Sequence, residues 1–342
     1  TVVNGGIISS WGSNARLGSG DWMVVEADES DGSFSRLKPT VAIVTNIDAE
    51  HLDHHGSFEN LETAFENFIT SIPFYGFAAL CIDHPSVQKL LPAASDRRVI
   101  TYGLSANADV RAVNLRHEAG QMLFDVQLSD RLEIAVDRLE DVQFPMLGEH
   151  NVQNCLAAIS ICLEMAIDPA VILSGLRQFK GVGRRFDFKG ETDGITIIDD
   201  YGHHPVEIRA ALSAGRMRAE QNKLIAVVQP HRYTRLRDLF SDFCACFNDA
   251  DHVIVSDVYA AGEAPIEGFE RDDLVEGLRA WGHRSVHAMQ DPSHLAAQIN
   301  DLATSGDLVM CLGAGTVTQW ASSLPQELAL LRSASPDKEA GE

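Results

Sequence analysis

The sequence predicts an α/β protein of two domains, each built around strands that alternate with helices. At 342 residues the chain is long enough for two hydrophobic cores. Apolar segments of strand length alternate with segments of helical spacing over residues 22–102 and again over residues 195–332. Between residues 108 and 144 the hydrophobic period changes to two, which indicates a small antiparallel meander. We therefore expect an α/β domain with a meander, followed by a Rossmann-like, doubly wound parallel sheet.

The first domain is expected to open with two apolar strands, at residues 22–25 and 41–45, each followed by acidic residues. A helix is expected over residues 58–72, where Leu61, Phe65 and Phe68 keep helical spacing. The other elements expected here are strands at 76–82 and 99–102, helices at 85–91, 148–165 and 171–179, and the meander at 108–144.

The second domain is expected to begin after the glycine-rich segment Gly181-Val-Gly-Arg-Arg-Phe186, which gives domains of residues 1–186 and 187–332. Residues 333–342 are rich in Ser, Pro, Lys and Glu and are predicted to form a disordered tail. The elements expected in the second domain are strands at 195–199, 224–228, 253–258, 286 and 308–312, and helices at 233–247, 272–281, 293–302 and from 205 and 316.

Composition limits the partners that this chain can have. The net charge of −22 argues against nucleic acid and against anionic membranes, and no apolar run is long enough to insert into a membrane. No signal peptide is found, and the start at Thr1 suggests a piece of a longer chain. The six cysteines lie in apolar contexts without a Cys-x-x-Cys pair, so we expect buried thiols in the cytoplasm.

Polar residues concentrate where the strand at 195–199 ends. Asp199, Asp200, Tyr201, Gly202, His203 and His204 follow it directly, and Pro205 can then open a helix. Ligands of parallel α/β sheets bind where strands end and helices begin, so this segment is a candidate site. The alternative is an ordinary strand-end turn, but such a turn needs fewer titratable groups.

Acidic strand ends in the first domain predict a metal site. Glu29 and His51 each follow an apolar strand and are surrounded by further carboxylates. Carboxylate oxygens suit Mg²⁺, whereas the neighbouring His54 and His55 also allow zinc, although no cysteine accompanies them. Solvated acidic loops remain the alternative.

Amides and arginines supply two further candidate groups. Asn151 and Asn154 are three apart at a helix start, where they could hydrogen-bond a purine or a neighbouring loop or, for Asn151, act as the N-cap. Five arginines fall in two short segments and suit phosphates or carboxylates, with surface ion pairs as the alternative. These arginines are Arg184, Arg185, Arg232, Arg235 and Arg237. The loops Gly313-Ala-Gly315-Thr316 and Asp257-Val-Tyr259-Ala-Ala-Gly262-Glu263 are weaker candidates for ligand contact.

Taken together, the motifs resemble those of the Mur ligases of peptidoglycan synthesis, in the family's order and over nearly the whole chain. The pattern Asp-Asp-Tyr-Gly-His-His-Pro is most similar to the branch that joins L-alanine to UDP-N-acetylmuramate. The tripeptide-recycling branch tends to have Phe-Ala in place of Tyr-Gly and remains an alternative. The segments that carry the resemblance are Glu26-Ala-Asp-Glu-Ser-Asp-Gly-Ser-Phe34, Asn46-Ile-Asp-Ala-Glu-His-Leu-Asp53, Gly148-Glu-His-Asn-Val-Gln-Asn154, Gly181-Val-Gly-Arg-Arg-Phe186, Asp199-Asp-Tyr-Gly-His-His-Pro205 and Gln229-Pro-His-Arg-Tyr-Thr-Arg235.

The resemblance implies an ATP-dependent, amide-forming reaction that passes through an acyl phosphate. It implies that Glu29 and His51 hold Mg²⁺ and that Asn151, Asn154, Arg184 and Asp200 contact ATP. Tyr201, His203, Arg232 and Arg235 would face the amino acid and the substrate carboxylates, with His203 as a candidate base.

One departure from the family concerns the phosphate-binding loop. Members of the family carry an N-terminal UDP-binding domain and then a P-loop, and no G-x-x-x-x-G-K-[ST] occurs in these 342 residues. The resemblance thus implies that the first domain is a central P-loop-type ATPase domain that is incomplete at its N-terminal side. We expect the chain by itself to turn over no ATP, and a non-catalytic ligand-binding scaffold is the alternative from another class.

Overall fold

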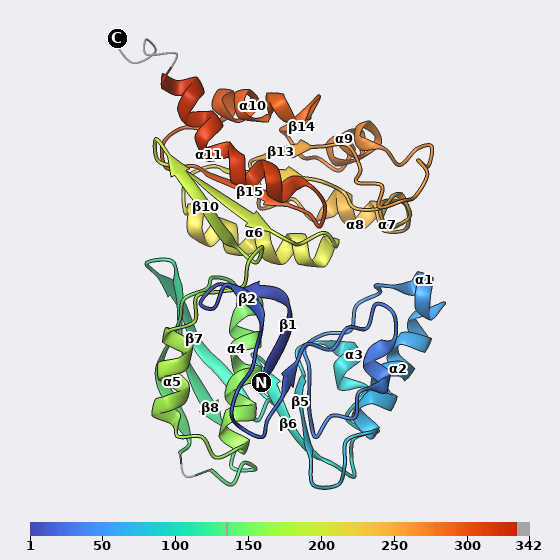
Figure 1. Cartoon of the computed structure of the whole chain (residues 1–342), viewed down its shortest axis with the longest axis vertical. Coiled ribbons are helices and arrows are strands. Elements are labelled where there is room, and N and C mark those ends of the chain that lie inside the picture. The colour runs from blue at the N-terminus through green and yellow to red at the C-terminus, as the bar shows by residue number, and fades with distance from the viewer. Residues whose placement is uncertain (135, 334–342) are drawn as a thin grey trace. The chain divides into compact units, whose positions relative to one another are not determined.

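The computed structural model of the chain describes residues 1–134 and 136–333 (Figure 1). Contacts divide it into two compact units, Thr1–Lys180 and Gly181–Glu342. Residues 181–186 make bonds within the second unit, since Tyr201 N donates to Arg184 O at 2.6 Å. The predicted tail lies outside the described residues, apart from Ser333, which ends a helix. None of the described helices has the length and apolar character needed to cross a membrane.

Unit 1 is built on a six-stranded sheet of order β4-β5-β6-β7-β8-β9. The strands are parallel from β4 to β7 and antiparallel from β7 to β9, so the predicted meander extends the parallel sheet instead of standing apart. Its elements are β4 (Val41–Val44), α1 (Leu52–His55), α2 (Phe58–Thr70), β5 (Phe77–Cys81), α3 (Pro85–Gln88), β6 (Arg98–Gly103), β7 (Val110–Glu118), β8 (Gln121–Leu128), β9 (Arg138–Phe144), α4 (Glu149–Glu164), α5 (Pro169–Arg177) and the 3₁₀ helix η1 (Ser33–Arg36).

Helix α2 shows how sequence signals position the elements of unit 1. The Ser57 hydroxyl accepts a hydrogen bond from Asn60 N at 3.2 Å, which caps the first turn. The helix then buries Leu61 and Phe68 in a cluster that includes Val44 and Leu80 of the sheet. This packing fixes the ends of β4 and β5, where the polar residues follow.

The strand predicted at residues 22–25 is shorter than expected and lies outside the six-stranded sheet. Only β3 (Val24–Val25) forms there, and both valines are exposed. It pairs in parallel with β1 (Val2–Ile8) in a separate three-stranded sheet that also contains β2 (Ser13–Arg16). The pairing of β3 depends on its register with β1. No strand was predicted for the β1 segment from the sequence.

Unit 2 is a doubly wound sheet of order β10-β11-β15-β12-β13-β14, parallel except for β10. Helices α6 to α9 contribute to one hydrophobic cluster and α10 and α11 to another, so both faces of the sheet are covered, as predicted. Its elements are β10 (Asp187–Thr192), β11 (Ile195–Asp200), α6 (Pro205–Ala219), β12 (Leu224–Val228), α7 (Tyr233–Asp238), α8 (Phe240–Ala245), β13 (His252–Val255), α9 (Arg271–Ala280), β14 (Val286–Ala288), the 3₁₀ helix η2 (Pro292–His294), α10 (Leu295–Leu302), β15 (Leu308–Leu312) and α11 (Val317–Ser333).

Candidate functional site

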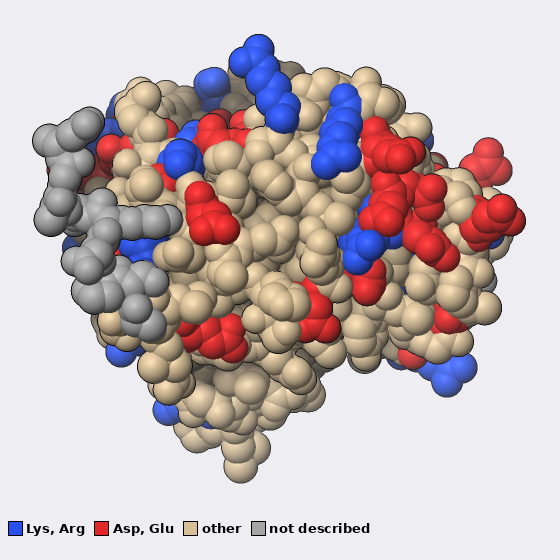
Figure 2. All heavy atoms as spheres, turned by 90° about the horizontal axis from the view of Figure 1, so that it is seen from above, with Lys and Arg blue, Asp and Glu red and all other residues tan. Residues whose placement is uncertain are grey.

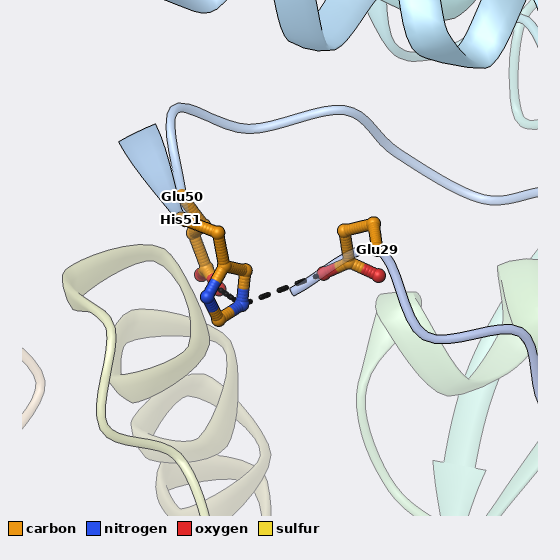
Figure 3. A group of neighbouring side chains, drawn as sticks. All are labelled: Glu29, Glu50 and His51. Carbon is orange, nitrogen blue, oxygen red and sulfur yellow. Dashed lines mark ion pairs between the residues drawn. The ribbon is translucent and has the colours of Figure 1, made fainter. Parts of the chain in front are cut away.

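In unit 1 the structure brings Glu29 and His51 together, with Glu50 as a third neighbour (Figure 3). His51 Nε2 lies 3.6 Å from Glu29 Oε1 and 3.6 Å from Glu50 Oε2. One ligand atom from each residue lies within 4.8 Å of the other two, and all three side chains are partly exposed. Two carboxylates and one imidazole at these distances fit a divalent cation that keeps several waters.

Local backbone geometry aims these side chains at one another. His51 adopts the left-handed conformation (φ 55°) at the N-cap of α1, and its side chain makes no capping hydrogen bond to that helix. His55 Nε2 lies 2.8 Å from the carbonyl oxygen of Glu29 and fixes the loop that carries this carboxylate. The two loops meet although the strands that precede them, β3 and β4, belong to different sheets.

Helix α4 places its two asparagines differently. Asn151 is buried and donates from Nδ2 to the carbonyl oxygen of Leu147 at 2.7 Å, whereas Asn154 is exposed. The alternative of Asn151 as N-cap was wrong, because Gly148 occupies that position with φ 100°. Asn151 therefore fixes the turn before the helix, and Asn154 is the amide presented to solvent.

In unit 2 the adjacent carboxylates at the end of β11 bond to different partners. Asp199 is fully buried, and its Oδ2 accepts from Thr318 Oγ1 at 2.6 Å and lies 3.6 Å from Lys189 Nζ. Asp200 accepts from Gly202 N through Oδ1 and from Phe186 N through Oδ2, both at 2.8 Å. Burial raises the pKa of Asp200 to about 6, against these two hydrogen bonds, which lower it.

Arginines stack on the tyrosine that follows this pair. The guanidinium carbon of Arg184 lies 4.6 Å and that of Arg185 5.3 Å from the centre of the Tyr201 ring. Arg184 Nη2 also donates to the carbonyl oxygen of Gly313 at 2.7 Å, so this arginine is held on two sides. Arg237, by contrast, is exposed and pairs with Asp238 at 2.7 Å, which is the surface ion pair considered as the alternative.

His203 is a neutral imidazole next to a carboxylate. Its Nδ1 lies 3.2 Å from Glu207 Oε2 and 3.1 Å from the carbonyl oxygen of Tyr201. The pKa of His203 is lowered to about 4, mainly by burial; Glu207 acts in the opposite direction, and Arg235 acts in the same direction as burial. Glu207 in turn accepts from the backbone N–H groups of His203 and His204 and completes the capping box of α6.

The loop after β12 carries both expected arginines and His231, a residue of the same motif to which the sequence assigned no role of its own. Arg232 is the N-cap of α7 with φ 68°, and Arg235 lies one turn into the helix. Arg235 Nη1 lies 3.3 Å from His231 Nδ1. The N-terminus of α7, where an anion was expected, holds the carboxylate of Glu263, which accepts from Thr234 N at 3.0 Å and from Thr234 Oγ1 at 2.7 Å.

The glycine loop after β15 is held by a buried glutamine of the β12 loop. Gln229 Oε1 accepts from Val317 N at 3.1 Å, and Gln229 Nε2 donates to Thr316 Oγ1 at 3.0 Å. The site in unit 2 is thus assembled from the carboxyl ends of β11, β12, β13 and β15. In the sequence, the signal for this contact is a glutamine, Gln229, directly after the apolar strand at residues 224–228.

Sequence comparisons identify the family to which these two units belong. A Mur ligase middle domain profile matches residues 14–162, and a profile of the Mur ligase glutamate ligase domain matches residues 184–315. The UDP-N-acetylmuramate–L-alanine ligase of Granulibacter bethesdensis is 57% identical over 335 residues, which cover 98% of this chain and 69% of that protein. The chain belongs to the Mur ligase family. The enzyme of the same name from Gluconobacter oxydans is 58% identical over 331 residues, which cover 97% of this chain and 69% of that enzyme.

Solved structures of Mur ligases share the fold at lower identity. The structure of UDP-N-acetylmuramate–alanine ligase from Thermotoga maritima matches with a TM-score of 0.78 at 24% identity. The match covers 98% of this chain and 69% of the Thermotoga chain. MurF ligase from Thermotoga maritima, solved in complex with ADP, gives 0.73 at 17% identity and covers 97% and 74%. These matches confirm the predicted fold class.

This Mur ligase is acidic as a whole, although its unit 2 site contains several arginines. The face of the molecule in Figure 2 carries Asp and Glu side chains in several groups, interspersed with separate Lys and Arg side chains. With a net charge of −22, the stacked and braced arginines of unit 2 are local concentrations of positive charge. Such a concentration selects for anionic groups of a small ligand.

Proposed function

We propose that this Mur ligase joins L-alanine to UDP-N-acetylmuramate at the expense of ATP. The observation that carries the proposal is 57–58% identity to L-alanine ligases over 97–98% of the chain. The tyrosine, two histidines and two arginines that cluster at the carboxyl edge of unit 2 support it, because an amino acid needs partners for both its amine and its carboxylate.

The reaction proceeds in two steps that activate a poor electrophile. A carboxylate oxygen of UDP-N-acetylmuramate attacks the γ-phosphorus of ATP, ADP departs, and an acyl phosphate forms. The amine of L-alanine attacks the acyl carbon, the tetrahedral intermediate expels phosphate, and an amide remains. The amine must lose a proton during the second step. His203 is neutral near pH 7, because burial lowers its pKa to about 4, so its imidazole has a lone pair for that proton, and Glu207 lies 3.2 Å away to stabilise the imidazolium that forms.

The proposal gives the two sets of polar residues separate roles. Glu29 and His51, with Glu50 beside them, hold Mg²⁺, which when bound neutralises charge on the phosphoryl oxygens. The four residues assigned to ATP contact are Asn151, Asn154, Arg184 and Asp200. The hydrogen bonds of Asn151 and Asp200 support an indirect role, in which they shape the loops around the nucleotide, whereas Asn154 and the Arg184 guanidinium are partly or fully exposed.

The remaining residues are assigned to the acceptor amino acid and the substrate carboxylates. Arg232 and Arg235 supply fixed positive charge at the end of β12, and Tyr201 and His203 lie at the end of β11. The five buried cysteines, all with free thiols, support a cytoplasmic location for this reaction.

The decisive experiment measures amide formation with the protein as its complete gene encodes it. With UDP-N-acetylmuramate and ATP, we expect radiolabelled L-alanine to enter a product of the mass of the UDP-linked amide, with one phosphate released per amide. Preferential use of the tripeptide over L-alanine would assign the chain to the recycling branch. Release of no phosphate with either acceptor would favour the non-catalytic scaffold.

The 342-residue chain alone serves as the matched control. Because no P-loop motif occurs in it, we expect it to release no phosphate above background under the same conditions. Phosphate release by this chain that depends on both substrates would contradict that expectation.

A further inference from the structure

A histidine that follows β5 lies against the loop that carries two of the metal-site residues of unit 1. Strands β4 and β5 are parallel neighbours, and Val44 of one is paired with Leu80 of the other. The segments after the two strands therefore leave the sheet side by side. Four residues beyond each paired residue, His84 Nε2 lies 3.4 Å from Asp48 Oδ1, which is an ion-pair distance.

The position of His84 is fixed by contacts of its own backbone and of the residue before it. Asp83 accepts hydrogen bonds from the backbone N–H groups of Leu104 at 2.7 Å and Ser105 at 2.9 Å. Gln153 Nε2 of α4 donates to the same carboxylate at 2.7 Å. His84 is the N-cap of α3, but its side chain makes no capping hydrogen bond. Its backbone is thus held in place, while its imidazole has its partner outside the helix that it begins.

The partner of this imidazole is a carboxylate with both oxygens in use. Asn46 Nδ2 donates to Asp48 Oδ2 at 2.6 Å, and Asp48 Oδ1 is the oxygen that faces His84. A carboxylate can only accept, so His84 Nε2 is the nitrogen that carries a proton. His84 Nδ1 is buried and has no hydrogen-bond partner among the described residues, which favours a lone pair at that position.

Asp48 begins the turn from which Glu50 and His51 extend. Glu50 N donates to Asp48 O at 2.8 Å, so the chain turns tightly between these two residues. His51 follows in the left-handed conformation, with φ 55°, which surrounding contacts must stabilise. The cluster in Figure 3 consists of Glu29, Glu50 and His51 and does not include Asp48. The Asp48 carboxylate therefore anchors the turn and leaves the binding of a cation to its neighbours.

We propose that His84 is a positioning residue for the divalent cation, because it holds the Asp48 carboxylate and thereby fixes the turn that presents Glu50 and His51. This inference rests on the metal site of the proposed function. A cation that keeps several waters has few protein ligands, so disorder in a loop that supplies two of them should weaken binding. Residues that orient metal ligands change metal affinity about 10–100-fold when they are replaced. Since His84 acts through Asp48, we expect the lower end of that range.

The test compares His84→Ala with His84→Gln in the protein as its complete gene encodes it. The Gln amide nitrogen reaches the position of Nε2 and can still donate to Asp48, whereas Ala removes the contact. Titration with Mn²⁺, followed by electron paramagnetic resonance of the free ion, should show about tenfold weaker binding for His84→Ala and nearly wild-type binding for His84→Gln. His117→Ala changes an exposed histidine of the same unit and should leave binding unchanged. A purely structural role of His84 would lower the midpoint of urea unfolding without changing the Mn²⁺ affinity of the folded protein.

A double-mutant cycle tests whether His84 acts through Asp48. If it does, His84→Ala should weaken Mn²⁺ binding no further in a protein that already carries Asp48→Ala. Additive effects of the two substitutions would overturn the proposal. So would Mn²⁺ binding by His84→Ala that is as tight as that of the wild type, or tighter. Equal binding by wild type and Glu29→Gln would instead overturn the metal site of the proposed function, and this inference with it.

Discussion

Replacement of Asp200 by asparagine should change the stability of unit 2 in a way that depends on pH. The carboxylate accepts two backbone hydrogen bonds, from Gly202 N and Phe186 N, in an environment that excludes water. An asparagine of the same shape presents one oxygen and one NH₂ group, so one of the two backbone N–H groups loses its acceptor. That loss costs about 1–3 kcal/mol at any pH.

The wild-type carboxyl group also takes up and releases a proton, which makes the free energy of unfolding depend on pH. Asparagine does not titrate and lacks this contribution. Burial raises its pKa from 3.8 to about 6, which corresponds to about 3 kcal/mol in favour of the protonated form. Because the folded-state pKa is the higher one, this stabilisation is fully present below pH 3.8 and is lost as the pH rises through about 6. Between pH 5 and pH 8 the wild type should lose about 1 kcal/mol through this group. Asp200→Asn should therefore gain that amount relative to wild type over the same interval.

Urea unfolding followed by pulsed hydrogen exchange on peptides of unit 2 measures this difference at both pH values. Asp301→Asn, which changes an exposed aspartate of the same unit, is the matched control for the substitution itself. A difference in the free energy of unfolding between Asp200→Asn and wild type that stays constant from pH 5 to pH 8 would refute the reasoning. A change of the opposite sign would refute it as well.

Three further predictions concern the metal site, a turn and the thiols. Glu29→Gln should weaken Mn²⁺ binding about tenfold or more, because the cation loses one of its anionic ligands, and titration followed by electron paramagnetic resonance of free Mn²⁺ measures this without any turnover. Gly194→Ala should destabilise unit 2 by more than about 1 kcal/mol, since φ is +78° and the new Cβ would lie 2.2 Å from Ser305 Oγ; the midpoint of urea unfolding reports it. Cys162 should be the first cysteine alkylated in the folded chain, because it is the only one not fully buried, and mass spectrometry after partial labelling at pH 8 identifies the site.

Much of unit 2 could be predicted from the sequence because its central strands are short, apolar and buried, and helices separate them along the chain. The strand at 308–312 was predicted with the bounds that β15 has, and polar segments were correctly placed after β11, β12 and β15. Position at a strand end is a local property of the chain. Because the strands of this sheet run parallel, their carboxyl ends and the polar segments that follow them meet at one edge of the sheet.

The parts that the sequence did not predict depend on pairing between distant segments. β10 is an edge strand whose exposed residues alternate weakly, and the strand β3 is defined by its register with β1. The carboxylate of Glu263 fills the N-terminus of α7 from 29 residues away, so no local pattern could show that this helix end is satisfied. His231 belongs to the segment singled out for its arginines, but its stacking on Tyr259 depends on the pairing of two loops that are far apart in the sequence.

The adjacent aspartates at the end of β11 illustrate how one strand end serves two purposes. Successive side chains of a strand point to opposite faces, so Asp199 and Asp200 cannot share partners. Asp199 contacts Lys189 and Thr318, and its Oδ2 lies 3.9 Å from Arg184 Nε. Its negative charge thus balances the positive charge of the lysine and the arginine. Asp200 turns to the backbone of the loops on either side and fixes their conformation. Asp199 therefore lies beside the Arg184 side chain, and Asp200 fixes the backbone next to Arg185 and Tyr201, so both carboxylates support the arginine–tyrosine stack that we assign to the substrates.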